Sequence, residues 1–130
     1  MLVLLTSAAL AGPAFDDPKE AVRAFVDAAD AQDTAKLEKA LHPEFRVVAQ
    51  MPDGVSVLSR ETYVGLVGAK KIGGTPRKQA YDAVVRTGDL ATVKGTLDSE
   101  AAHFDSTWTV VRTDAGWQVV QDATVFEPKK

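Results

Sequence analysis

Residues 103–126 carry side chains that could exchange protons or bind a polar ligand. His103 is one of only two histidines, and Asp105 and Asp122 are carboxylates in the same stretch. A histidine beside a carboxylate can act as a general acid or base, and a partly desolvated carboxylate can bind a hydroxyl or an amine. Thr107 and Thr109 follow Asp105 at a spacing of two, which in a strand places all three on one face. The stretch predicts a polar ligand patch, a proton-transfer pair or simply a solvated sheet face.

Composition excludes several other kinds of chemistry. The 130 residues include no cysteine, which rules out disulfides, thiolate nucleophiles and cysteine-based metal sites, and two histidines cannot form a multi-histidine site. A net charge of −3 gives no electrostatic footprint for nucleic acid. The sequence also lacks a glycine-rich phosphate loop and a nucleophile motif. We therefore expect no metal, no cofactor and no nucleic-acid partner.

The first residues are typical of an export signal. Residues 2–11 are apolar apart from Thr6 and Ser7, a length that fits a signal peptide and is too short to span a bilayer. Residues 9–11 form a small-residue cleavage signal, although no Lys or Arg precedes the apolar run. We expect residues 1–11 to be a signal peptide removed before Gly12, which gives a periplasmic or secreted protein. Otherwise the segment is an apolar N-terminus of a cytoplasmic protein.

Three helices and six strands are expected after this segment. Asp17, Asp33 and Ser59 are good N-cap residues, each followed by apolar residues at helical spacing. The helices are expected from residue 18, from 34 to 41 and from 60 to 69. Alternating apolar residues bounded by turns predict strands at residues 45–50, 55–58, 79–86, 91–98, 102–112 and 117–126. The basic stretch KKIGGTPRK is expected to be a flexible, solvated loop. The order predicts one α+β domain over residues 16–127, with the helices on one face of a curved sheet.

This order and four stretches of sequence resemble the nuclear transport factor 2-like superfamily. The stretches are VDAADAQDTAKLEKALHPEF, SRETYVGLV, GDLATVKGTL and FDSTWTVVRTDAGWQVV. The part from SRETYV to AGWQVV is most similar to the putative lumazine-binding subgroup. The resemblance implies a cone-shaped α+β fold whose three helices pack on the concave face of a curved, mostly antiparallel sheet. The superfamily includes ketosteroid isomerase, scytalone dehydratase, polyketide cyclases and protein-docking modules, so the fold leaves the function open.

The last two strands are expected to form a hairpin, and its register decides which side chains face the helices. A loop over residues 113–116 pairs Arg112 with Trp117, and strict alternation then sorts the side chains into two faces. One face carries Phe104, Ser106, Trp108 and Val110 with Trp117, Val119, Ala123 and Val125. The other carries His103, Asp105, Thr107, Thr109 and Val111 with Val120, Asp122, Thr124 and Phe126. On this register Asp105 lies opposite Thr124 and Asp122 opposite Thr107, which places the two acids about 7–8 Å apart.

Two arguments predict opposite orientations of this hairpin. Burial alone places the tryptophan face against the helices, because apolar faces seek cover. The resemblance implies the reverse, since the superfamily position matching Phe126 points into the cone while the parity of Trp117 points to the convex side, through which many members dimerise. We expect the second arrangement, which a single β-bulge would reverse. The homodimer interface is then expected to contain Trp108, Val110, Trp117, Val119 and Val125.

The polar face of the hairpin is then expected to line a ligand cavity closed by apolar residues of the helices and the first strand. Asp82 would join it if Asp82 lies opposite Gly95, where a glycine leaves room for the carboxylate; the alternative places Asp82 on the solvated side. The expected lining is Phe25, Phe45, Tyr63, Val67, Asp82, Asp105, Thr107, Thr109, Asp122 and Phe126.

The resemblance also bears on catalysis. The oxyanion tyrosine, the general-base aspartate and the protonated aspartic acid of ketosteroid isomerase match Phe25, Ala49 and Thr109. Phe25 cannot donate a hydrogen bond, Ala49 cannot take a proton, and Thr109 does not titrate at a useful pH. We therefore do not expect that chemistry here.

The predicted function is binding of a small hydrophobic or mixed-polarity ligand, or of a partner, by an exported homodimer with no membrane span and no assigned catalytic residue. One alternative is a cofactor-free isomerase, cyclase or lyase that uses His103 with Asp105 or Asp122. A second alternative is a protein-docking module that uses the convex face of the sheet.

Overall fold

The structure is a computed structural model that describes residues 15–129. The predicted signal peptide and its cleavage site before Gly12 lie outside these residues. Within residues 15–129, no helix is long and apolar enough to cross a membrane.

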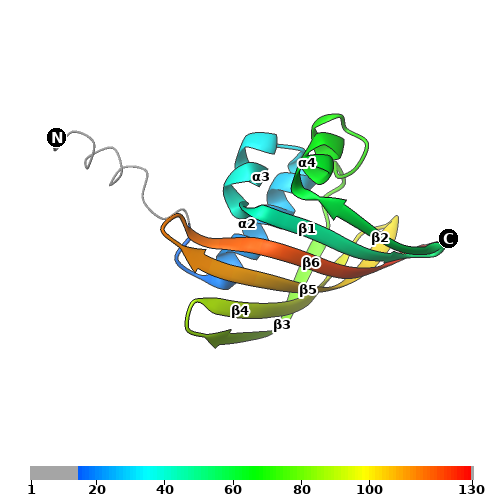
Figure 1. Ribbon diagram of the computed structural model, residues 1–130. Coiled ribbons are helices and arrows are strands. Elements are labelled where there is room, and N and C mark those ends of the chain that lie inside the picture. Colours follow the sequence, from blue (N-terminus) through cyan, green and yellow to red (C-terminus); the bar gives the residue numbers. More distant parts are fainter. Residues whose placement is uncertain (1–14, 130) are drawn as a thin grey trace.

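Each helix begins where a polar capping side chain was expected. The side-chain oxygens of Asp17, Asp33 and Ser59 each accept a hydrogen bond from a backbone N–H of the first helical turn. The helices are α2 (Pro18–Ala31), α3 (Thr34–Ala40) and α4 (Arg60–Gly68). Figure 1 shows all three on one side of the sheet, as the sequence predicts.

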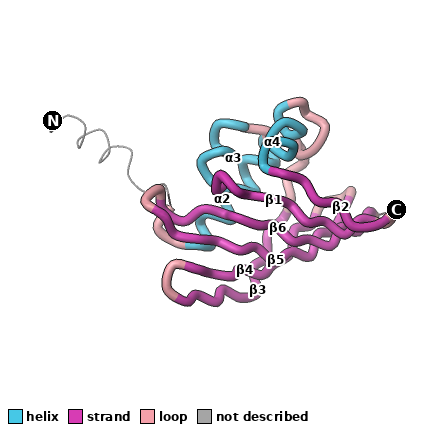
Figure 2. The backbone as a smooth tube through the Cα atoms, viewed as in Figure 1, coloured by secondary structure: helices cyan, strands magenta, loops and turns pink. Residues whose placement is uncertain are grey.

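Six strands form one curved, mixed sheet in the order β2-β1-β6-β5-β4-β3. The pair of β1 and β6 is parallel, and the other neighbouring pairs are antiparallel. The strands are β1 (Leu41–Met51), β2 (Gly54–Ser59), β3 (Lys78–Thr87), β4 (Leu90–Asp98), β5 (Ala102–Thr113) and β6 (Gly116–Pro128). Figure 2 shows the long central strands running beneath the helices. The predicted α+β class and helix placement are confirmed.

The core lies between the helices and the inner face of the sheet, and both tryptophans belong to it. Trp108, Val110, Trp117 and Val119 are fully buried in one cluster with Phe25 and other residues of α2. The prediction that these four residues form an exposed dimer interface is therefore wrong. Burial of the largest apolar side chains decides the orientation of the hairpin, as the hydrophobic effect requires.

A β-bulge at Val120 explains how that prediction failed. Arg112 pairs with Trp117 as expected, and Val110 pairs with Val119, but Thr109 pairs with Gln121. One extra residue therefore lies in β6, and every later side chain of that strand changes face. Asp122 lies opposite Trp108 instead of Thr107, and Asp105 lies opposite Val125 instead of Thr124.

The bulge places both Trp117 and Phe126 on the inner face. Beyond it, Asp122, Thr124 and Phe126 share this face with Trp108, Ser106 and Phe104. Asp105, Thr107, Thr109 and Val125 lie on the opposite face, which is called the outer face below. Strict alternation would place Phe126 and Trp117 on opposite faces of the sheet. The bulge allows both side chains to face inwards.

A second bulge in β3 moves Asp82 out of its expected position. Arg86 pairs with Ala91 as expected, but Tyr81 pairs with Gly95 and Ala83 pairs with Lys94, so Asp82 has no partner and is exposed. Gly95 does not make room for the Asp82 carboxylate. Its lack of a side chain allows the β3 backbone to approach closely, since an added Cβ would lie 2.4 Å from the Ala80 carbonyl oxygen.

Candidate ligand-binding pocket

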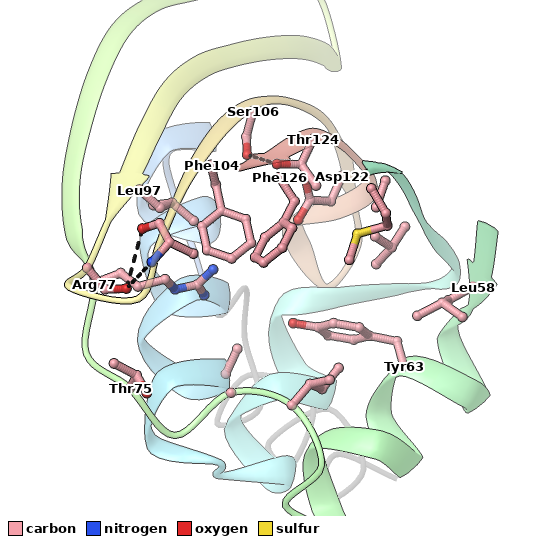
Figure 3. A pocket seen from close by; sticks show the side chains of 18 of the residues that line it. Leu58, Tyr63, Thr75, Arg77, Leu97, Phe104, Ser106, Asp122, Thr124 and Phe126 are labelled. Carbon is pink, nitrogen blue, oxygen red and sulfur yellow. Dashed lines mark hydrogen bonds between the residues drawn. The ribbon is translucent and has the colours of Figure 1, made fainter. Parts of the chain in front are cut away.

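The inner face of the sheet opens beside α4 into a pocket of about 480 Å³. Its walls come from β1, β2, β5 and β6, from α4, and from the segment 69–77 that connects α4 to β3. Most of the lining is apolar, and it includes the aromatic rings of Tyr63, Phe104 and Phe126. The polar lining residues are Ser56, Thr75, Arg77, Ser99, Ser106, Asp122 and Thr124. Figure 3 shows Arg77, Tyr63, Asp122 and the two phenylalanines projecting towards the same space.

Asp122 is a buried acid in this pocket. It is 9% exposed, and its Oδ1 has no hydrogen-bond partner in the described structure. Burial raises the pKa of Asp122 from 3.8 to about 7, while the positive charge of Arg77 and the nearby indole N–H of Trp108 act in the opposite direction. The Trp108 Nε1 atom lies close enough to favour the carboxylate but does not reach hydrogen-bond geometry. Asp122 is therefore poised to change charge near neutral pH.

Arg77 is fixed in place by Asp30 of α2. Arg77 Nε donates to Asp30 Oδ1 at 2.7 Å, and the Arg77 backbone N–H donates to Asp30 Oδ2 at 3.0 Å. Burial raises the pKa of Asp30, and Arg77 works against that rise. The guanidinium also lies over the ring of Phe104, with its central carbon 4.9 Å from the ring centroid. These contacts hold a cation at the pocket wall in one orientation.

Tyr63 is supported from behind by two core aromatics. Its ring centroid lies 5.9 Å from that of Phe25 and 5.6 Å from that of Phe45, and both of those rings are buried. Burial raises the pKa of the Tyr63 hydroxyl well above its ordinary value, and the charge of Asp122 adds to the rise. Tyr63 therefore keeps its proton and can donate a hydrogen bond at neutral pH.

Two hydroxyl groups on the pocket floor satisfy each other. The oxygens of Ser106 and Thr124 lie 2.7 Å apart, and Ser106 is 1% exposed. Beside them the rings of Phe104 and Phe126 pack with centroids 5.2 Å apart and an interplanar angle of 59°. This part of the floor is therefore predominantly apolar towards a ligand.

The structure brings three of the predicted cavity residues to the pocket and leaves seven elsewhere. Tyr63, Asp122 and Phe126 line it. Phe25, Phe45 and Val67 are buried in the core behind it, because the helices pack against the sheet at those positions. Asp82 lies outside it because of the bulge in β3, whereas Asp105, Thr107 and Thr109 lie on the outer face of β5 because the alternate residues, including Trp108, face inwards.

His103 does not join either aspartate in a proton-transfer pair. Its Nδ1 lies 3.1 Å from Asp98 Oδ1 on the outer face, whereas Asp122 lies on the inner face. Asp105 interacts with Lys94, whose Nζ is 3.4 Å from Asp105 Oδ1, and both side chains are about half exposed. An exposed pair of this kind contributes little stability. The predicted pairing of His103 with Asp105 or Asp122 is therefore not supported by the geometry.

Most of the pocket lining escaped the sequence analysis, including Phe104, Ser106 and Arg77. Phe104 and Ser106 share a face with the tryptophans, which was assigned to the wrong side of the sheet. Arg77 belongs to the stretch that was interpreted as a solvated loop, and no local pattern links it to Asp30, which lies on a different element. A partly buried carboxylate such as Asp30 needs a cationic partner, and a search for that partner could have identified Arg77.

Comparison with known proteins agrees with the resemblance. The family model described as Putative lumazine-binding matches residues 15–124. No curated protein matches the chain.

Three similar solved structures show the same fold. A nuclear transport factor 2-like protein of unknown function from Silicibacter pomeroyi DSS-3 is 21% identical, with a TM-score of 0.70 over 85% of this chain and 92% of the other. Another, from Shewanella baltica OS155, is 13% identical, with a TM-score of 0.73 over 99% and 98%. A protein with a cystatin-like fold from Burkholderia xenovorans LB400 is 18% identical, with a TM-score of 0.67 over 86% and 90%.

Proposed function

The chain belongs to the Putative lumazine-binding family of the nuclear transport factor 2-like superfamily, and from this premise we propose that its pocket binds a small, flat organic molecule of mixed polarity. The observation that carries the proposal is an apolar cavity of about 480 Å³ that contains an acid with an unpartnered oxygen. A volume in this range is typical of sites for small molecules, as is an apolar lining with few polar groups. The family's description mentions lumazine, a flat bicyclic heterocycle, which is therefore the first probe to test.

The shape of the lining supports a flat ligand. The rings of Tyr63, Phe104 and Phe126 offer apolar surfaces on which an aromatic ligand can stack. Arg77 and Asp122 add a fixed cation and a titratable acid, which give the ligand an orientation. A purely apolar ligand would leave the Asp122 oxygen and the terminal nitrogens of Arg77 without partners, and this is costly in a desolvated site.

Thermal unfolding in the presence of flat bicyclic compounds tests the proposal. A ligand that binds only the folded state adds about 2.7 kcal/mol of stability at a concentration one hundred times its Kd. The Ala49→Phe variant places a ring in the pocket and is expected to abolish the shift. Its matched control is Val48→Phe, because Val48 is the preceding residue of β1 and faces outwards. Stabilisation that persists unchanged in Ala49→Phe would place the ligand elsewhere and refute the proposal.

We also propose that the protein is a homodimer that uses the outer face, where Val125 is the one residue of the expected interface that stays exposed. Val55 and Val57 of β2 and Val125 of β6 are 69%, 62% and 39% exposed. Gln50 of β1 pairs with both Val55 and Val125, so these side chains lie close together across three neighbouring strands. Three exposed valines on neighbouring strands form an apolar patch that a second copy of the chain would cover.

We further propose export, on the strength of the apolar run and the cleavage signal that ends at Ala11. The expected mature protein begins at Gly12. Amino-terminal sequencing of the protein from its native host tests this, and an N-terminus at Met1 or Leu2 would refute it.

A further inference from the structure

Two polar groups of the pocket have opposite character and unused hydrogen-bonding capacity. Asp122 Oδ1 is buried and accepts no hydrogen bond. Arg77 uses Nε and its backbone N–H on Asp30, and within residues 15–129 its two terminal nitrogens donate to no protein oxygen. Figure 3 shows the guanidinium directed into the pocket. The pocket therefore offers an acceptor from β6 and a forked donor from segment 69–77.

The neighbouring hydroxyl and carboxyl groups do not compete for these two positions, and the Trp108 indole N–H lies near Asp122 without reaching hydrogen-bond geometry. Ser106 and Thr124 bond to each other, and Asp30 is occupied by Arg77. Tyr63, the other titratable group that faces Asp122, stays protonated and can add a further donor. A ligand must therefore form hydrogen bonds with one acceptor and with one cationic donor beside an apolar floor.

A ligand with a single charge can pair with only one of the two groups, Asp122 or Arg77. An alkylammonium would satisfy Asp122 but would be repelled by Arg77. A carboxylate would satisfy Arg77 but would face the acid of Asp122. A neutral edge that carries a donor beside an acceptor satisfies both, because neither end then needs a counter-ion from the protein.

We propose that the pocket recognises a planar heterocycle by a lactam or imide edge, whose N–H donates to Asp122 and whose carbonyl oxygen accepts from Arg77. The proposal rests on the proposed ligand-binding function and deepens it by defining the ligand's polar edge. The rings of Phe104 and Phe126 contact the ligand's apolar face, and Tyr63 stays available to a second carbonyl. A ligand with a donor gives the unpartnered Asp122 oxygen the hydrogen bond that it lacks.

Three bicyclic probes of similar shape test the edge by isothermal titration calorimetry. Lumazine carries N–H and carbonyl groups, 1,3-dimethyllumazine keeps the carbonyls but has no N–H on that ring, and quinoxaline has neither. Wild-type protein is expected to bind lumazine at least about tenfold more tightly than the other two, because removing one partner of a buried hydrogen bond leaves the other group unsatisfied. The Asp122→Leu variant is expected to bind lumazine only as tightly as quinoxaline.

A matched control and a second variant sharpen the test. Asp105→Leu removes an acid from the outer face and is expected to leave all three affinities unchanged. Arg77→Lys keeps a positive charge but loses the fork, and is expected to weaken lumazine binding while leaving quinoxaline binding unchanged.

The outcomes separate this proposal from the ligand-binding function itself. If wild type binds dimethyllumazine or quinoxaline as tightly as lumazine, the edge proposal is overturned and ligand binding stands. If none of the three probes binds, both are overturned. The comparison on wild-type protein needs no variant to fold.

Discussion

Burial of Asp122 couples the protonation of one side chain to the folding of the chain. In the unfolded chain its carboxyl ionises with a pKa near 3.8, but in the folded protein burial raises that pKa to about 7. Between these values the folded state holds a proton that the unfolded state has lost. Stability therefore falls as the pH rises through this window, and levels off above about 7. The difference amounts to at most about 4 kcal/mol, which water entering the pocket reduces.

The Asp122→Asn variant is expected to remove this pH dependence. Asparagine has the shape of the protonated acid and cannot ionise, so its stability should match wild type near pH 4. At pH 8 the variant should be more stable than wild type by roughly 1–4 kcal/mol. Urea unfolding between pH 4 and pH 8 measures the difference.

Asp105→Asn is the control for that measurement, because Asp105 is an exposed acid on the neighbouring strand. It should leave the shape of the pH profile unchanged. An Asp122→Asn profile that runs parallel to wild type at every pH would contradict the buried, protonated acid.

At the scale of the elements, the sequence predicted what local chemistry determines and missed what packing determines. Asp17, Asp33 and Ser59 cap their own helices, so the helix starts were readable. The bulge at Val120 lies in a run of valines and glutamine without a glycine or proline, so nothing local marks it. It lets Trp117 near the turn and Phe126 at the far end of β6 lie on the same face of the sheet.

Arg77 shows the same limit at the pocket. Its partner Asp30 lies on α2, and only the path of segment 69–77 across the end of that helix brings the two together. Contacts between residues so far apart in sequence have no local signature. Period-two alternation assigned Asp122 and Phe126 to the same face correctly, because no bulge separates those two residues.

Segment 69–77 is attached to α2 at a position where only glycine fits. Gly73 has a φ of +80°, and an added Cβ would lie 2.3 Å from the Ala29 carbonyl oxygen. Gln32 Nε2 also donates to the Ile72 carbonyl at 3.0 Å. The Gly73→Ala variant is therefore expected to lose roughly 1–3 kcal/mol of stability and to loosen the wall that carries Arg77. Urea unfolding measures the first effect, and amide hydrogen exchange in the segment measures the second.

Gly65→Ala is the matched substitution for this prediction. Gly65 lies within α4, and a Cβ there meets nothing within 4 Å, so alanine is expected to stabilise the helix by up to about 1 kcal/mol. Equal effects of the two substitutions would show that the close approach of Gly73 to Ala29 does not constrain the fold.

At the scale of the whole molecule, the helices cover one face of the sheet and the outer face keeps apolar side chains in contact with solvent. If a second copy covers Val55, Val57 and Val125, a charge at the centre of this patch has to be desolvated on assembly. Val57→Glu is therefore expected to give a folded monomer, and wild type is expected to be a dimer. Sedimentation velocity at matched concentrations distinguishes the two.

The control for assembly is Val85→Glu, because Val85 is as exposed as Val57 but lies on β3, at the other edge of the sheet. This variant should stay dimeric. A monomeric wild type, or loss of the dimer in both variants, would contradict an interface built on the β2-β1-β6 side.

The position of β6 has a consequence for how the protein is made. It follows every other strand along the chain, yet it lies in the middle of the sheet between β1 and β5. While a ribosome is still synthesising residues 116–128, the earlier strands can form only two separate pieces, each with an open edge where β6 belongs. Asp122, Thr124 and Phe126 arrive on the same strand that joins those pieces. A truncated translation product that lacks β6 therefore lacks both a continuous sheet and a binding site, and is expected to be cleaved by proteases more readily than the full chain.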